Sequence, residues 1–265
     1  MDTSSFEKEL RKDNYAENSI IAYRYAVSEF FARFNALSKE NLLLYKTWLI
    51  ESYKPKTVNL RIQGIDKYLD YIGHPDLKIK MVKIPKSSFL DNMVSNDDYE
   101  YFKSRLRGEK DRRWYFIVWT LASTGARVSE LVQLQIEQVR DGFYDIFSKG
   151  GRIRRIYLPP RLRNELLAWV DRDSGYLFVN RFGNQITPRG VAQQLKELAV
   201  KYGINPSIIH PHSFRHLFAI NFLTKSNDLV LLADLLGHES VDTTRIYLQR
   251  SSRDQKKLIE QVVDW

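Results

Sequence analysis

The chain has 265 residues with a formal net charge of +9, and 43% of the residues are hydrophobic. This apolar content is enough for packed cores, and the length has room for two modest domains. The absence of cysteine excludes disulfides, thiol catalysis and cysteine-bound zinc. The positive charge favours a polyanionic partner such as nucleic acid, although many ordinary proteins are as basic.

The N-terminal segment is polar. Residues 1–15 have no apolar core and therefore do not resemble a signal peptide. No stretch of the chain approaches the roughly 20 apolar residues that a membrane-spanning helix needs. We therefore expect a cytoplasmic protein with no membrane partner.

Residues 1–80 have the apolar spacing of helices and predict a helical domain. Capping residues mark three helices: the first begins after Asn18 or Ser19, the second near Ser38 and Asn41, and the third at Thr57, ending at Gly73. Three cations, Lys54, Lys56 and Arg61, cluster at the start of the third helix. They line a phosphate-binding face or form an ordinary solvated surface.

A lysine-rich segment without glycine follows, and Pro85 disfavours a helix at its centre. We take residues 81–92 as a basic linker in which Lys83 and Lys86 are candidate DNA contacts. Such a tether would let two domains clamp opposite faces of a duplex. The alternative is a hinge with no role in binding.

The pattern changes from about residue 93. Ser95 caps a helix, residues 114–124 form an apolar helix that ends at Gly125, and Gly150-Gly151 joins two extended runs into a hairpin. Further helices are expected at 187–203, 211–224 and 228–237, with a last one after Ser240 or Asp242. The sum is a mainly α fold with a small antiparallel β element.

The first chemical feature of this domain is Arg127, which follows the helix-ending glycine and could present two N–H groups to phosphate oxygens. Glu130 could orient it, although surface Arg–Glu pairs at this spacing are common. Lys149 lies at the hairpin turn, where it could reach a leaving oxygen.

Arginines follow Lys149 along the second hairpin strand. Arg152, Arg154 and Arg155 would suit contact with the DNA backbone. The competing interpretation is a solvated hairpin edge blunted by charges.

Pro211 fits the first position of a helix, so His212 and Arg215 lie on one helix face. Together they offer a proton-transfer group and a second phosphate clamp. The i, i+4 spacing of His212 and His216 would also allow zinc, but the sequence offers no obvious third ligand, and we expect no metal or other cofactor. We interpret His216 as a structural histidine packed under the helix.

His238 follows a helix-ending glycine, and Tyr247 lies nine residues later on the next short helix. Alone, the first would be a capping residue and the second a core residue. Two arginines, two histidines, a lysine and a tyrosine are nevertheless the groups needed to stabilise a pentacoordinate phosphorane and to exchange one of its oxygens for another.

These residues, in this order, resemble the tyrosine recombinase family, also called the phage integrase family, and in particular its compact Xer-like members. The resemblance covers nearly the whole chain and is most specific in the C-terminal motifs. The matching stretches are TGARVSEL, SKGGRIRRIYLP, HPHSFRH, LLGHESVDTTRIY and, more loosely, SIIAYRYAVSEFFARF with KPKTVNLRI.

The resemblance implies phosphate-binding roles for three residues. Arg127 and Arg215 would bind the scissile phosphate and stabilise its transition-state charge, and His238 would hydrogen-bond a phosphate oxygen.

It implies proton-transfer and nucleophilic roles for three more. Lys149 would protonate the leaving 5′-oxygen, His212 would assist proton transfer, and Tyr247 would form a 3′-phosphotyrosyl bond. That bond stores the energy for rejoining, so neither ATP nor a metal would be needed.

The resemblance also implies a two-domain architecture: residues 1–80 as a core DNA-binding domain and 93–265 as a mixed α/β catalytic domain. The implied partners are double-stranded DNA with an inverted-repeat core site, a homotetramer that passes through a Holliday junction, and accessory DNA-bending or directionality proteins. Residues 254–265 would pack on a neighbouring subunit as an exchange tail, or form a self-packed final helix.

Two other functions compete with recombination. A type IB topoisomerase uses similar residues to nick and relax one duplex, and a catalytically silent DNA-binding regulator could keep the same scaffold. The spacing of the motifs argues against the first, and the complete residue set argues against the second. The DNA target and the biological outcome (integration, inversion or dimer resolution) cannot be deduced from residue types.

Overall fold

The computed structural model describes residues 3–84, 93–147, 153–238, 241–248, 259–260 and 263. The chain divides into two compact units, Met1–Lys86 and Ser87–Trp265, each with its own apolar core. Residues 85–92 of the expected linker, Lys86 among them, lie outside the described residues. Within the described ranges, no helix is both long enough and apolar enough to cross a membrane.

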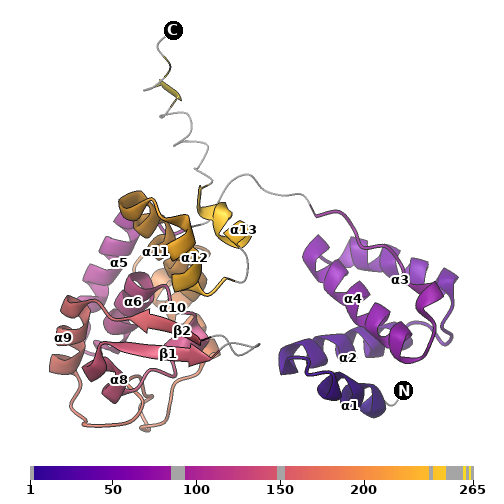
Figure 1. Ribbon diagram of the computed structural model, residues 1–265, viewed down its shortest axis with the longest axis horizontal. Helices are drawn as coiled ribbons and strands as arrows, with labels where there is room; N and C mark the ends of the chain where they lie inside the picture. The colour runs from indigo at the N-terminus through magenta and orange to yellow at the C-terminus, as the bar shows by residue number, and fades with distance from the viewer. Residues whose placement is uncertain are drawn as a thin grey trace. The chain divides into compact units, whose positions relative to one another are not determined.

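Unit 1 is a small helical bundle (Figure 1). Its elements are α1 (Ser4–Lys12), α2 (Glu17–Phe31), α3 (Lys39–Ser52), α4 (Pro55–Tyr71) and the 3-10 turn η1 (Pro75–Leu77). α2 and α4 approach closely at Gly64, where an added Cβ would lie 2.9 Å from the Cβ of Ala26. The core beneath is aromatic, with Phe30 and Tyr45 buried in edge-to-face contact.

The cap predictions for this unit are partly right. Ser38 caps α3 as expected, since its Oγ accepts a hydrogen bond from the Asn41 backbone N–H at 3.1 Å. α2 begins at Glu17, so the expected cap at Asn18 or Ser19 is wrong. Glu17 places a carboxylate in the first turn, where it complements the helix dipole and pairs with Arg11.

α4 begins at Pro55, two residues before the expected start at Thr57. Proline has no N–H to donate and its φ is already helical, so it suits the first helical position. The end of the helix is close to expectation: Tyr71 is its last residue, and Gly73 then adopts a left-handed conformation with φ +78°.

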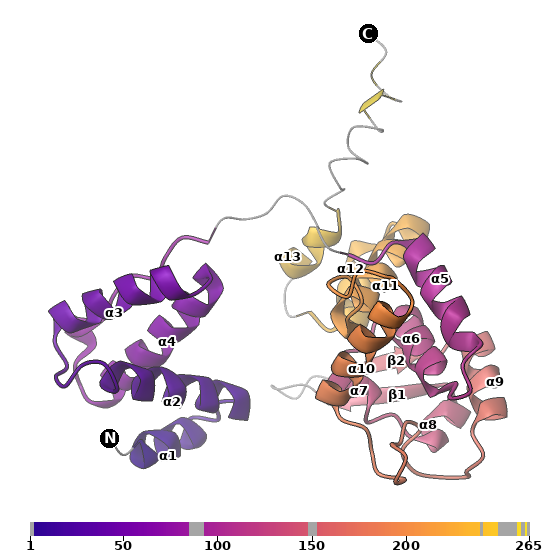
Figure 2. The same ribbon diagram turned by 180° about the vertical axis from the view of Figure 1, so that it is seen from behind.

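In unit 2, helices pack around a central buried helix, and a two-stranded sheet lies on one side of them (Figures 1 and 2). Its elements are α5 (Asn96–Arg107), α6 (Arg113–Thr124), α7 (Val128–Leu131), α8 (Ile136–Asp141), β1 (Phe143–Phe147), β2 (Ile153–Tyr157), α9 (Pro160–Trp169), α10 (Pro188–Lys201), α11 (Pro211–Ser226), α12 (Leu229–Leu236), α13 (Val241–Thr244) and the 3-10 turn η2 (Arg245–Leu248). This mainly helical fold with a small antiparallel sheet confirms the expected fold class.

The apolar run at 114–124 is the buried core helix that the sequence predicts. Its side chains Phe116, Ile117 and Val118 have no exposed surface, and α6 packs against α11. The helix ends because Gly125 turns left-handed with φ +63°. An added Cβ there would lie 2.5 Å from Cδ1 of Phe218 on α11, so both the turn and the close approach require glycine.

We predict that Gly125→Ala lowers the free energy of unfolding by about 2–4 kcal/mol, because it combines backbone strain with overpacking against Phe218. Gly183→Ala is the matched control. Gly183 has φ +78° but nothing within 4 Å of an added Cβ, so it should cost only about 1 kcal/mol. Urea unfolding followed by tryptophan fluorescence measures both, and equal losses would show that the close approach imposes no constraint.

Candidate active site

The candidate site begins where α6 ends. The left-handed turn at Gly125 leads into Arg127, which is the N-cap of the short helix α7. Its guanidinium is half exposed and donates to Oε1 of Glu130 at 2.9 Å, with a longer contact of 3.5 Å from Nη2 to the Gly237 carbonyl. The Arg127 side chain is therefore oriented by protein contacts and still open to solvent.

Glu130 contacts Arg127, the residue that the sequence suggests it orients, and it also binds a second arginine. The carboxylate is buried, with Oε2 accepting the Arg127 backbone N–H at 2.7 Å and also pairing with Arg154 of β2. One carboxylate therefore joins the start of α7 to the hairpin. Its burial strengthens each of these charge-assisted bonds.

The expectation of a DNA contact from Arg154 does not fit its position in this fold and needs correction. Residues along a strand alternate between faces, and Arg154 points inward with only 8% of its surface exposed. It donates to Glu130 and to the carbonyl of Leu236 at the end of α12. Arg154 therefore connects the hairpin with the ends of two helices.

Arg215 of α11 is almost fully buried, at 2% exposure. It donates from Nη1 to the Gly125 carbonyl at 2.7 Å and from Nη2 to the Leu236 carbonyl at 2.6 Å. Burial lowers its pKa to about 10, and the nearby positive charges of Arg127 and Arg154 act in the same direction. The side chain stays cationic at neutral pH and is held rigidly by backbone oxygens.

The end of α12 is the meeting point of these side chains. Gly237 ends the helix in a left-handed conformation with φ +62°, which leaves the last carbonyls without helical partners. Arg154 and Arg215 both donate to Leu236, and Arg127 approaches Gly237. Cationic donors suit a helix C-terminus because they complement the negative end of its dipole.

The next residue, His238, completes this group. Its Nε2 lies 3.2 Å from Nη2 of Arg215, and its Nδ1 lies 2.8 Å from Oγ1 of Thr244. Burial lowers the pKa of His238 to about 4, and the positive charges of Arg215 and Arg127 act in the same direction. The ring is therefore neutral at pH 7.

Tyr247 lies in the same site, on η2 directly after α13, and is 8% exposed. Its ring stacks on His238, with centroids 6.4 Å apart and planes at 13°, and contacts His216 at 5.3 Å. Burial raises the pKa of its hydroxyl, while the charge and hydrogen bonding of Arg215 offset part of the rise.

His212 and His216 contact each other on α11, with ring centroids 4.3 Å apart. His216 is partly buried, as expected for a packed histidine, and burial lowers its pKa to about 4. Burial lowers the pKa of the more exposed His212 as well. Among the described residues, no group of three or more potential ligands is placed to hold a metal ion.

Among the described residues, three arginines and one carboxylate give this site an excess of positive charge. Arg127, Arg154 and Arg215 surround Glu130, and the neighbouring histidines are held neutral. Such a site is suited to a phosphate anion, because the anion would supply the missing negative charge.

The hairpin turn that carries Lys149 and Arg152 lies outside the described residues, so the positions of these two side chains are not described. Arg155 is exposed on β2 and pairs with Asp145 on β1, with Nε and Oδ1 2.8 Å apart. The cross-strand register brings this acid opposite Arg155, and it neutralises part of the charge that the local sequence suggests.

Unit 1 exposes some of the cations named from the sequence. Lys54, Lys56 and Lys83 are all exposed. Arg61 is not on an open surface: its side chain is 15% exposed, lies 4.2 Å from the centre of the Tyr25 ring, and pairs with buried Glu29. The expectation of a phosphate contact from Arg61 therefore does not fit its position.

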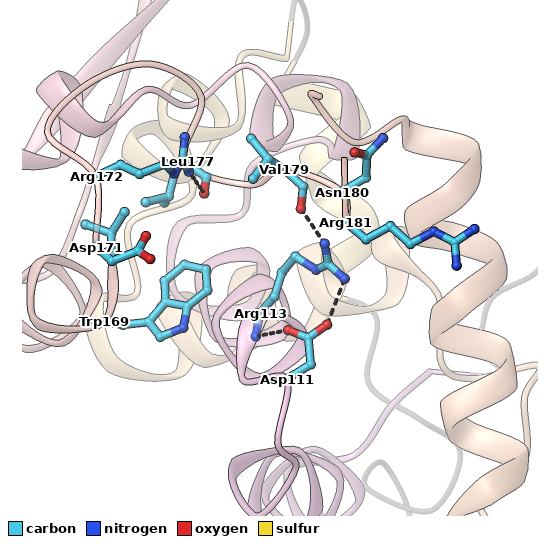
Figure 3. A pocket seen from close by; sticks show the side chains of 10 residues that line it. Asp111, Arg113, Trp169, Asp171, Arg172, Leu177, Val179, Asn180 and Arg181 are labelled. Atoms are coloured by element: carbon cyan, nitrogen blue, oxygen red, sulfur yellow. Dashed lines mark hydrogen bonds and ion pairs between the residues drawn. The ribbon is translucent and has the colours of Figure 1, made fainter. Parts of the chain in front are cut away.

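A hollow elsewhere in unit 2 contains none of these site residues. It has a volume of about 390 Å³ and lies between the start of α6, the end of α9 and the loop at 177–181 (Figure 3). Its Arg113 is tied to Asp111 and to the Val179 carbonyl, which leaves it little capacity to bind a further anion. Within the part of the chain that the structure describes, no histidine or tyrosine lines it.

Comparison with known proteins gives consistent matches. Residues 95–253 match the phage integrase family. The tyrosine recombinase XerA of Pyrococcus furiosus is 30% identical, over 96% of this chain and 91% of that protein. Two solved structures share the fold: XerH site-specific recombinase bound to difH substrate (21% identity, TM-score 0.67, 96% and 83% of the two chains) and a lambda integrase dimer bound to a COC′ core site (14% identity, TM-score 0.73, 92% of each chain).

We predict that Glu130→Gln lowers the free energy of unfolding by about 3–5 kcal/mol, because it leaves the buried Arg154 without its counter-charge. Asp145→Asn, which removes the exposed partner of Arg155, is the matched control and should have a far smaller effect. Urea denaturation of both variants tests this, and similar losses would show that Arg154 does not depend on Glu130.

Proposed function

The chain belongs to the phage integrase family of tyrosine recombinases and is a site-specific DNA recombinase, and we propose that it cleaves DNA through Tyr247 in the site described above. The observation that carries this proposal is the convergence of four side chains from separate segments of unit 2. Arg127, Arg215, His238 and Tyr247 lie around one cationic site.

In this proposal the hydroxyl oxygen of Tyr247 attacks the scissile phosphorus. The bond from phosphorus to the 5′-oxygen breaks, giving a 3′-phosphotyrosyl link and a 5′-hydroxyl end. The reverse attack by a 5′-hydroxyl restores a phosphodiester and releases the tyrosine. The covalent bond stores the energy of the broken one, so the cycle has no need of ATP.

Arg127 and Arg215 would share the charge of the phosphorane. Arg215 is fixed by two carbonyls, so it meets the phosphate without reorganisation, while the half-exposed Arg127 reaches the incoming anion from the solvent side. Fixed donors of this kind stabilise developing charge more than mobile ones do.

Proton transfer falls to His212 and Lys149. The lowered pKa of His212 keeps it neutral at pH 7, so it can accept the proton of Tyr247. Lys149 would protonate the leaving 5′-oxygen from the hairpin turn, a role that rests on its motif position alone.

Binding of double-stranded DNA would use both units. The exposed Lys54, Lys56 and Lys83 would contact backbone phosphates from unit 1, in keeping with residues 1–80 as the core-binding domain. Arg155 would do so from the hairpin, and Arg152 would join it there.

Strand exchange would take place in a homotetramer on an inverted-repeat core site, through a Holliday junction. Ile259 and Val263 are exposed and one helical turn apart, which supports residues 254–265 as an apolar tail that packs on a neighbouring subunit. Accessory DNA-bending or directionality proteins would set the outcome of the reaction.

We predict that Tyr247→Phe abolishes the covalent adduct with a nicked core-site duplex and leaves DNA affinity nearly unchanged, because one hydroxyl adds little to a charged interface. Tyr157→Phe, an exposed tyrosine of the same unit, is the control and should form the adduct normally. A denaturing gel in buffer with EDTA detects the adduct. An adduct in Tyr247→Phe would refute the nucleophile, and loss of the wild-type adduct in EDTA would revive a metal-dependent mechanism.

Because Tyr247 packs against His238 and His216 of its own chain, we predict attack in cis. Arg127→Ala should raise the activation free energy of cleavage by about 3–4 kcal/mol, because it removes a contact that stabilises the transition state. Mixing it with Tyr247→Phe on half-site substrates should not restore adduct formation, because neither chain has a complete site. Restored cleavage in the mixture would show that the tyrosine is donated to a neighbouring subunit.

A further inference from the structure

His238 contacts a different partner with each ring nitrogen. Nε2 lies 3.2 Å from Nη2 of Arg215, and Nδ1 lies 2.8 Å from Oγ1 of Thr244. These two contacts determine where the ring proton must be.

A guanidinium has N–H donors and no acceptor, so Nε2 of His238 can only accept the hydrogen bond from Arg215. A neutral imidazole carries one proton, which must then be on Nδ1. Nδ1 therefore donates to Oγ1 of Thr244. If the threonine hydroxyl donated instead, the ring would have no proton at all, so that arrangement is excluded.

Thr244 is well placed for this task. It has no exposed surface, so water does not compete for its oxygen. It is the last residue of α13, and η2 with Tyr247 follows directly. Its hydroxyl is thus a buried acceptor fixed between His238 and the nucleophile segment.

We infer that Thr244 is a positioning residue: its hydroxyl accepts the Nδ1–H of His238 that the contact with Arg215 requires, and so holds the ring with Nε2 facing Arg215. The inference rests on the proposed function for its catalytic consequence, though not for the tautomer itself. The other tautomer would place an N–H of His238 against an N–H of Arg215. Arg215 would then lose one of its three hydrogen-bond partners, and the carbonyls of Gly125 and Leu236 would be the two that remain.

The surroundings of His238 keep the ring neutral, which is why its tautomer matters. Its pKa of about 4 reflects burial first and then positive charge. The described titratable and charged groups around it are Arg215, His212 and His216 from α11, Arg127 before α7, Arg154 from β2 and Tyr247 from η2. Among the described residues, no carboxylate is named as shifting it.

The tautomer can be measured directly on the DNA-free protein by ¹⁵N NMR of the histidine ring nitrogens at pH 7. The wild type should show a protonated Nδ1 and an unprotonated Nε2 at His238, and so should Thr244→Ser, which keeps the hydroxyl. Thr244→Val has nearly the same shape but no acceptor, so the Nδ1–H of His238 should lose its hydrogen bond and its proton resonance should move upfield. A wild-type ring protonated on Nε2, or an Nδ1–H resonance that Thr244→Val leaves unchanged, would overturn the inference.

Cleavage rates of a nicked core-site duplex then test the link to Arg215. Thr244→Val should be slower by about 10- to 100-fold, the loss typical when the partner that orients a metal-ligating imidazole is removed, and Thr244→Ser should recover most of the rate. In a His238→Ala background, Thr244→Val should cost less than about twofold further. An equal loss in both backgrounds would show that Thr244 acts only by anchoring the tyrosine segment.

The two proposals fail in different ways. If wild type forms no adduct but NMR shows the Nδ1 proton, the proposed chemistry fails and the tautomer assignment stands. If wild type forms the adduct and the ring is protonated on Nε2, the recombinase assignment stands and the role of Thr244 is wrong.

Discussion

Buried positive charge with too few carboxylates is the constraint on which the architecture of unit 2 depends. Arg154 and Arg215 are both buried and, among the described residues, share Glu130 as their nearby counter-charge, with Arg127 at the edge. A buried cation is costly unless its donors are satisfied. Backbone carbonyls released at helix ends meet that requirement, so the glycines that end α6 and α12 belong to the site as much as the charged residues do.

This arrangement has a functional consequence. Carbonyl oxygens satisfy hydrogen bonds without neutralising charge, so the site stays cationic and rigid before any phosphate arrives. The histidines beside it are kept neutral by the same burial and the same charges. In the proposed mechanism, the electrostatics that favour a phosphate thus also leave His212 able to accept a proton and His238 able to hold Arg215.

Predictions based on neighbouring residues in the sequence were wrong where the alternation of side chains along a strand, the cross-strand register or helix packing decided the contact. Arg154 and Arg155 look equivalent in a run of arginines, but the pleat buries the first and exposes the second. Asp145 is remote from Arg155 in the hairpin sequence and faces it across the sheet. Arg61, at the start of a helix with exposed lysines, folds back onto Glu29 because the helix face there meets α2.

The sequence by itself determined the mainly helical fold, the hairpin, the ends of α6 and α12, and the residue types of the site. Those signals are local: apolar spacing, capping residues, and glycines where φ must be positive. Only the tertiary structure decided that Leu236 receives two arginines, that Glu130 joins α7 to β2, and that Thr244 meets His238. Such contacts join segments whose separation in sequence carries no periodic signal, and they are fixed only when the helices pack and burial makes every donor find an acceptor.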